Sequence, residues 1–293
     1  MNMKNINRRS LAFVMIVSLL LAVTPITENA IAAPDTAPST GGAQAAPAAV
    51  AATGPAIPTA YGAFTSSYAA AMYLPGTNTI RVQPIRTYLD RSKPMIALTF
   101  DDGPSQYTEH IVELLDRYDC RATFCVIGNR VGPQKGRVRA VAAQGSEVVG
   151  HSWDHKNLTS LSKKKIRREL KKTNQAIKSV TGVRPAMYRP PYGAYDEKVR
   201  KASKKLHLAL LTWSYDTKDW KSLDPKKVYG RIKKHAEGDQ ILLMHDIHES
   251  TAIAMDKVIP WLVGQGYELV TVSELMYYKG IDIKPGIVYN DGI

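Results

Sequence analysis

The sequence predicts an α/β fold in which helices cover a parallel β-sheet. From Lys93 onward, short apolar segments alternate with longer amphipathic segments, and this alternation is typical of consecutive βα units. It yields about seven units, and seven or eight strands can close into a barrel. No GxGxxG or similar phosphate-binding glycine loop follows a predicted strand, which disfavours a nucleotide-binding fold.

The predicted strands are apolar runs bounded by glycine, proline or polar residues. The first, Met95–Phe100, is followed by Gly103-Pro104, which stops the strand. The other predicted strands are Ala122–Ile127, Glu147–Gly150, Met187–Tyr188, Leu208–Trp213, Gln240–Met244 and Glu268–Thr271.

The predicted helices have apolar residues spaced three and four apart, which places them on one face. Ser162 and Asp196 are suited to cap a helix N-terminus, and Pro225 suits a first turn. The predicted helices are Tyr107–Tyr118, Val131–Gln144, Leu161–Thr181, Asp196–Leu206, Pro225–Ala236, Ile253–Gly264 and Val272–Tyr278.

The N-terminal segment has the pattern of a secretory signal peptide. Basic residues precede an apolar run from Leu11 to Val23, and Ala30-Ile31-Ala32 offers small residues for cleavage. The run is short for a membrane-spanning anchor, which is the alternative. We therefore expect residues 1–32 to be removed and the protein to act outside the cell.

The rest of the chain divides by composition. Residues 33–60 are rich in alanine, proline and threonine, as expected of a linker, and residues 61–92 form an N-terminal extension. The catalytic domain is predicted at 93–280, and residues 281–293 form an unassigned C-terminal tail.

The net charge of +13 favours a polyanionic partner. Nucleic acid and an anionic cell wall both fit, but no zinc-finger, RNP or similar nucleic-acid motif is present. Because the protein is expected to be exported, an anionic cell wall is the favoured partner. Cys120 and Cys125 are the only cysteines, and an extended strand between them separates them too far for a disulfide. We expect two buried thiols.

Polar residues gather after the predicted strands, at the end where α/β folds place their chemistry. Asp101 and Asp102 follow the first strand, although Asp-Gly-Pro is also a common turn sequence. His151 and His155 follow the third strand and would share a face if the segment were helical. With Asp102, they offer two nitrogens and one oxygen to a divalent metal such as zinc and leave a position open for water. Asp101 would then be the proton acceptor.

Three further clusters follow later strands. Arg189 begins Arg-Pro-Pro-Tyr-Gly, where its side chain can pair with Asp101 and the Tyr192 N–H can stabilise an oxyanion. Asp216-Thr217-Lys218-Asp219-Trp220 offers an indole surface for a sugar ring. His245, at the end of the sixth strand, is suited to act as a general acid.

Five clusters in this order resemble the motifs of the NodB-homology polysaccharide deacetylases, carbohydrate esterase family 4. The matching segments are Thr99–Pro104, His151–His155, Arg189–Tyr192, Asp216–Trp220 and Leu243–His245, which resemble TFDDGP, HS(x2)H, RxPY, DxxDW and LxH. The likeness extends over roughly residues 93 to 278. Cys125 departs from the aromatic residue often found there in this family.

The resemblance implies a distorted (β/α)7 barrel and a metal-dependent hydrolase that removes acetyl groups from N-acetylated sugars. It also implies the role of each residue. Asp101 is the base, Arg189 orients it, and Asp219 tunes the acid His245. Asp102, His151 and His155 bind the metal. Tyr192 supplies the oxyanion donor. Trp220 and Leu243 line the acetyl and sugar pocket.

We therefore expect a secreted, wall-associated monomer that deacetylates peptidoglycan N-acetylglucosamine with a divalent metal, either zinc or another transition metal such as cobalt. Chitin oligomers and acetylated xylan are alternative substrates. A non-catalytic wall-binding protein is the alternative class, but such a descendant would be expected to lack a metal ligand or the base, and this chain retains them all.

Overall fold

The computed structural model describes residues 84–291. The predicted signal peptide, the linker and most of the N-terminal extension lie outside these residues. None of the helices within residues 84–291 combines the length and apolar character needed to cross a membrane.

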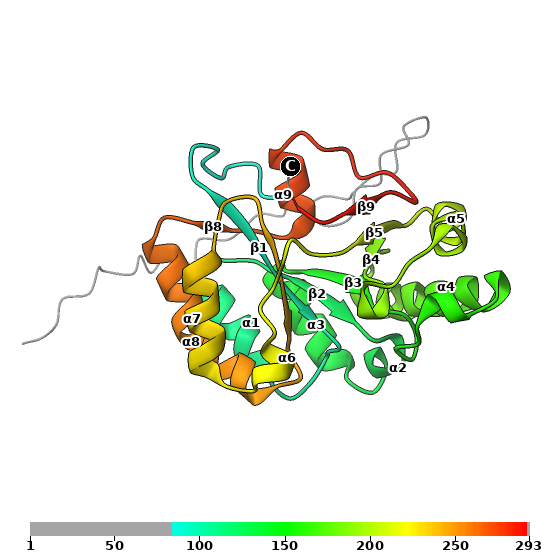
Figure 1. The fold of residues 1–293 in the computed structure, drawn as a ribbon, viewed down its shortest axis with the longest axis horizontal. Helices are drawn as coiled ribbons and strands as arrows, with labels where there is room; N and C mark the ends of the chain where they lie inside the picture. The colour runs from blue at the N-terminus through cyan, green and yellow to red at the C-terminus, as the bar shows by residue number, and fades with distance from the viewer. Residues whose placement is uncertain (1–83, 292–293) are drawn as a thin grey trace, which may run out of the picture. The chain divides into compact units, whose positions relative to one another are not determined.

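The sheet runs in the order β6-β7-β1-β2-β3-β4-β5-β9, and β8 pairs with β1 beside this path. Neighbouring strands are parallel. The sheet and its helices curl into a half-barrel (Figure 1), which confirms the predicted distorted (β/α)7 fold. The strands are β1 (Met95–Asp101), β2 (Thr123–Val126), β3 (Glu147–Gly150), β4 (Met187–Tyr188), β5 (Ala209–Leu211), β6 (Tyr215–Asp216), β7 (Ile241–His245), β8 (Glu268–Leu269) and β9 (Val288–Tyr289).

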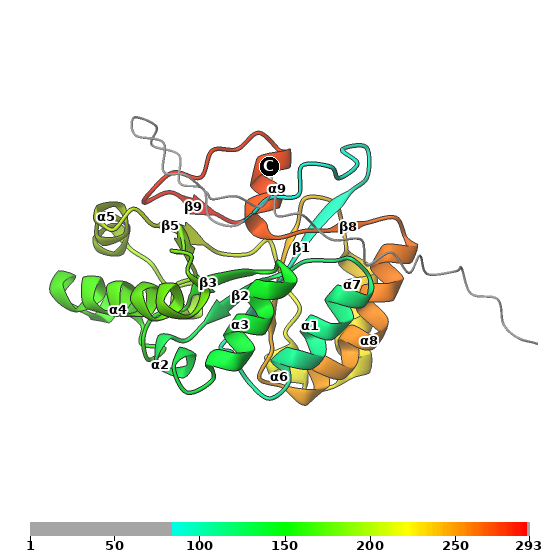
Figure 2. The same cartoon turned by 180° about the vertical axis from the view of Figure 1, so that it is seen from behind.

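Helices cover the outer face of the sheet, with α7, α8, α1, α3, α4 and α5 following one another around it (Figures 1 and 2). Asp196 caps α5 as predicted, accepting a hydrogen bond from the Val199 N–H at 2.8 Å. The helices are α1 (Thr108–Arg117), α2 (Gly128–Val131), α3 (Lys135–Gln144), α4 (Lys163–Thr181), α5 (Glu197–Lys205), α6 (Asp219–Ser222), α7 (Pro225–His235), α8 (Glu249–Gly264) and α9 (Val272–Tyr278).

Two predicted helices differ from the structure. The single helix expected at 131–144 is divided into α2 and α3 around Gly132-Pro133, because proline has no N–H to donate within a helix. Helix α8 begins at Glu249, one turn before the predicted Ile253. The short elements β6, α6 and β9 were not predicted.

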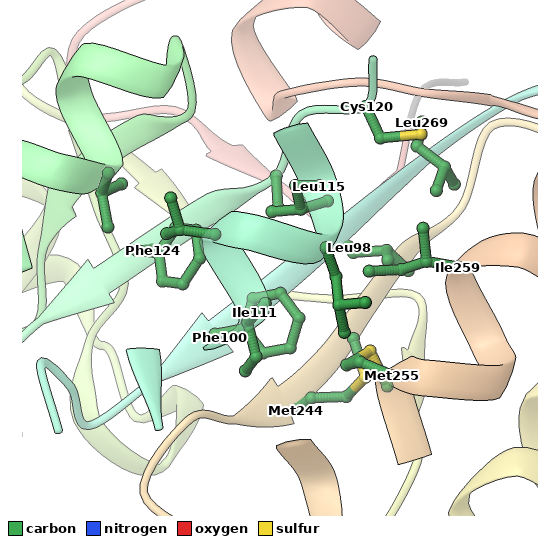
Figure 3. Close-up of a cluster of buried hydrophobic side chains, with 14 of the residues drawn as sticks. Leu98, Phe100, Ile111, Leu115, Cys120, Phe124, Met244, Met255, Ile259 and Leu269 are labelled. Atoms are coloured by element: carbon green, nitrogen blue, oxygen red, sulfur yellow. The ribbon is translucent and has the colours of Figure 1, made fainter. Parts of the chain in front are cut away.

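Both faces of β1 are buried, but they face different parts of the core. Leu98 and Phe100 pack with the covering helices (Figure 3), and the Phe100 ring stacks on Phe124 with centroids 5.1 Å apart. Met95 and Ala97 belong to the second cluster, inside the curled sheet. Because strand side chains alternate, Asp101 also faces the inside.

Residues on either side of the predicted domain contact it. The buried Arg86 side chain donates to the Glu274 carboxylate on α9 at 2.9 and 3.0 Å, and to the carbonyls of Asp119 and Leu269. Near the C-terminus, β9 pairs with β5. The domain boundaries at 93 and 280 stay predictions.

Candidate active site

Side-chain alternation directs residues at the ends of neighbouring strands towards the inside of the curled sheet. Cys125, Val149 and Met187 lie in the inner cluster. Side chains two residues later, His151 and Arg189 among them, therefore point inward at the carboxyl end of the sheet. His151 and Arg189 continue the parallel ladder, since their N–H groups donate to Val126 O at 2.8 Å and Gly150 O at 2.9 Å.

Asp101 forms a buried ion pair with Arg189. Their Oδ1 and Nη1 atoms lie 2.7 Å apart, and the guanidinium also donates to Thr99 Oγ1 and Thr212 O, each at 2.8 Å. Burial opposes ionisation of Asp101, but the charge of Arg189, with a smaller contribution from His245, outweighs burial and holds the pKa of this carboxyl below its usual value. Asp101 is thus an oriented, ionised carboxylate.

The three predicted metal ligands converge. One ligand atom from each of Asp102, His151 and His155 lies within 4.8 Å of the others. Nε2 of His155 and of His151 lie 3.1 and 3.4 Å from Asp102 Oδ1. The four-residue spacing of the histidines would place them on one face of a helix, but residues 151–155 do not form a helix. They form a turn in which Ser152 and His155 have φ values of 58° and 59°.

The donor set fits a divalent cation. Asp102 Oδ1 is buried and has no hydrogen-bond partner among the described residues, although the two imidazole nitrogens approach it. The Nδ1 of His151 lies 2.8 Å from Arg189 O, so Nδ1–H donates and Nε2 keeps its lone pair. Burial lowers the pKa of His151, which favours the neutral imidazole that metals bind.

His245 lies beside Asp101 on β7, whereas His151 follows β3, on the other side of β1. The pairing of β1 with β7 places Asp101 directly opposite His245. Its Nδ1 lies 2.9 Å from Asp219 Oδ1, and Asp219 Oδ2 accepts from the His245 N–H and from Thr251 Oγ1, each at 2.7 Å. Burial disfavours the charged imidazole, but the hydrogen bond and charge of Asp219, together with Asp101 and Asp102, raise the pKa of His245 to about 9. His245 can therefore hold a proton on Nε2.

The predicted substrate-contacting residues differ in exposure. Tyr192 is 68% exposed, has a φ of 62° and packs its ring edge-on against His155 with centroids 4.8 Å apart. Trp220 is 49% exposed on α6, whereas Leu243 is only 4% exposed on β7, two residues before His245. Tyr192 and Trp220 thus present open surface, and Leu243 presents little.

Sequence reasoning missed Thr99 and Thr251, which contact Arg189 and Asp219, and it gave no role to Asp246. Asp246 is buried and accepts hydrogen bonds from the Thr108 and Ser105 hydroxyls. A Cβ atom on Gly103 would lie 2.3 Å from Asp246 Oδ1, so only glycine fits there. Asp246 thereby fixes the loop that follows Asp101 and Asp102. The adjacency of Asp246 to His245 was the only sequence signal.

The polysaccharide deacetylase family profile matches residues 89–211. Peptidoglycan-N-acetylglucosamine deacetylase PgdA of Listeria monocytogenes is 39% identical over 186 residues, which cover 63% of this chain and 39% of PgdA. A Bacillus cereus peptidoglycan-N-acetylglucosamine deacetylase is 32% identical over 194 residues, covering 64% of this chain and 91% of the relative. This chain thus spans about two fifths of the length of PgdA and most of the Bacillus cereus protein.

Among solved structures, a family 4 acetyl xylan esterase from Clostridium thermocellum in complex with a cobalt ion superposes with a TM-score of 0.63. It shares 31% sequence identity, and the alignment covers 67% of this chain and 98% of the esterase.

Proposed function

This chain belongs to the polysaccharide deacetylase family, and we propose that it hydrolyses the N-acetyl groups of peptidoglycan N-acetylglucosamine and releases acetate. The observation that carries the proposal is the convergence of Asp101, the Asp102-His151-His155 cluster and His245 at one end of the sheet. The names of the relatives from Listeria monocytogenes and Bacillus cereus support the choice of substrate.

Asp102, His151 and His155 would hold a divalent cation, most simply Zn²⁺, because two imidazoles and one carboxylate suit a catalytic zinc site. The cobalt complex of the related esterase supports a transition metal. When bound, the cation supplies a Lewis acid for the acetyl carbonyl and favours a nucleophile at neutral pH.

The proton transfers are assigned to two residues. Asp101 accepts the proton of the attacking water, and Arg189 keeps this carboxylate ionised and oriented. His245 donates its Nε2 proton to the amine nitrogen as the carbon–nitrogen bond breaks, and Asp219 holds the imidazole through Nδ1. The products are acetate and a free sugar amine.

Three residues are assigned to the substrate. The Tyr192 N–H would donate to the oxygen that becomes negative in the transition state. Trp220 offers an exposed ring face for a sugar. Leu243 would form the apolar floor of the acetyl pocket, close to His245 on β7.

We further propose that the protein is exported and acts in the cell wall as a monomer. The basic residues, the apolar run to Val23 and the small residues before Ala33 support export. N-terminal sequencing of the protein from culture medium or wall should find a chain that begins near Ala33. A membrane-bound chain that still begins at Met1 would contradict this assignment.

Acetate release tests the activity and the substrate together. The protein is incubated with purified peptidoglycan, chitin oligomers or acetylated xylan, with and without a chelator. We expect the fastest release from peptidoglycan and loss of release with chelator. Faster acetate release from chitin oligomers or acetylated xylan would assign that polysaccharide as the substrate in place of peptidoglycan. No release from any of the three would favour a non-catalytic wall protein.

A further inference from the structure

Helix α4 has a strongly basic surface that the catalytic site does not use. Its single acidic residue, Glu169, is buried and accepts a hydrogen bond from the Trp153 N–H at 3.1 Å. The basic residues of the helix are Lys163, Lys164, Lys165, Arg167, Arg168, Lys171, Lys172 and Lys178. The exposed charge of α4 is therefore almost wholly positive.

A surface pocket of about 240 Å³ lies along the second half of α4. Its charged side chains are Lys171, Lys178 and Arg184, and its floor is formed by Leu170, Leu206 and Leu208, with Asn174 and Gln175 between them. Arg184 Nη2 donates to Leu206 O at 2.9 Å, which fixes the guanidinium at the rim. Within residues 84–291, none of these three cations forms a salt bridge, so their charges are available to an anion.

We propose that this pocket binds phosphate groups of a phosphodiester-linked polymer. Lysine, arginine and side-chain amides are the donors that phosphate oxygens accept, and the leucine floor suits the carbon atoms between phosphates. Lys164, Arg168, Lys171, Gln175 and Lys178 recur at spacings of three and four, so they form one stripe about 21 Å long on α4. A stripe of that length fits successive phosphates better than one isolated ion.

Among the described residues, no large hydrophobic side chain stands exposed on α4, and the pocket leucines lie at its floor. The large exposed hydrophobic residues of the described chain, such as Tyr192, Trp220 and Ile253, lie outside α4 and the pocket. Bases of a single-stranded nucleic acid have no ring on which to stack, and a bilayer has no apolar anchor. The surface therefore disfavours single-stranded nucleic acid and a bilayer as ligands and favours contact with phosphate groups alone.

The pocket lies at the end of the sheet away from the catalytic residues. Arg184 precedes β4, and Leu206 and Leu208 precede β5, whereas Asp101 and His245 end their strands. Figures 1 and 2 show α4 and α5 together at one side of the described domain. A polymer held here would leave the active site open and would tether the enzyme to an anionic matrix.

Binding of synthetic poly(glycerol phosphate) to the full chain tests the proposal without an activity assay. Lys171→Gln/Lys178→Gln removes two pocket charges, and Lys233→Gln/Lys234→Gln removes two exposed charges from α7 as the matched control. The pocket variant should bind about tenfold more weakly and reduce the slope of log K against log salt by about two, roughly one per lysine. The control should change binding by less than about twofold.

Equal loss in both variants would overturn the proposal, because the attraction would then come from net charge alone. Tighter binding of single-stranded RNA, polygalacturonate or phosphatidylglycerol vesicles than of poly(glycerol phosphate) would also overturn it and would name a different ligand. Acetate release should be unchanged in both variants. A failure of the wild-type protein to release acetate would contradict the proposed function and leave the binding result intact.

Discussion

Nη1 of Arg189 lies 2.7 Å from Oδ1 of Asp101, and both side chains are buried inside the curled sheet. The two residues are far apart in sequence and meet because β1 and β4 end at the same edge. The pair keeps Asp101 ionised despite its burial and leaves Oδ2 directed towards His151, whose Nε2 is 3.7 Å away.

Replacement of Arg189 should therefore act through Asp101. In Arg189→Gln, loss of the positive charge should raise the pKa of Asp101 and move the acidic limb of kcat/KM to higher pH. Activity at neutral pH should fall about 10–100-fold, as is usual when a partner of a site residue is lost. A pH profile that keeps its shape at reduced amplitude would mean that Arg189 has only a structural role.

Asp219 should set the alkaline limb of the pH profile. The protonated form of His245 is the active acid, and its pKa is raised to about 9, so activity should fall as pH rises through about 9. Asp219→Asn removes the charge that raises this pKa, and the limb should move to lower pH. An unchanged limb in the variant would assign it to another group.

His155 should be required for metal binding. His155→Ala leaves two of the three proposed ligands, and ligand loss weakens affinity strongly. Elemental analysis should find less than stoichiometric metal, with a far-ultraviolet spectrum like that of the wild type. His110→Ala, which alters an exposed histidine paired with Asp256, is the control and should keep its metal. Full metal content in His155→Ala would remove His155 from the ligand set.

Arg86 should stabilise the fold although it lies before the predicted domain. Arg86→Ala leaves the buried Glu274 with Arg121 as its remaining ion-pair partner, and breaking a buried pair costs about 3–5 kcal/mol. Urea unfolding should show this loss. Lys93→Ala, which breaks an exposed pair with Glu268, should cost about 0.2–1 kcal/mol. Equal costs for both variants would mean that residues before 93 do not stabilise the domain.

Local sequence patterns predicted most strands and helices because apolar spacing reflects which face is buried. They also placed Asp101, His151, Arg189 and His245 at the carboxyl ends of strands, where Asp101 and His245 are the last strand residues and His151 and Arg189 directly follow β3 and β4. The turn at residues 151–155 was not predictable from spacing. The two histidines converge because Ser152 and His155 adopt left-handed backbone conformations, and not because they lie on one face of a helix.

Contacts between distant segments were beyond local patterns. The Thr251 hydroxyl reaches Asp219 from the start of α8, and β9 joins β5 from a tail without a strand pattern. Such contacts depend on the packed fold, in which residues remote in sequence become neighbours. The roles of the site residues themselves stay predictions until the variants are measured.

The separation of roles between the adjacent aspartates is the central claim, and metal titration of Asp101→Asn, followed by acetate release, tests it most directly. The variant keeps the proposed ligands Asp102, His151 and His155, so it should bind metal as tightly as the wild type while turnover falls by about 10²–10⁴-fold at every metal concentration. Asp102→Asn, titrated in parallel, should bind metal weakly and regain part of its activity with excess metal. Rescue of Asp101→Asn by added metal, with no rescue of Asp102→Asn, would contradict the account and exchange the two roles.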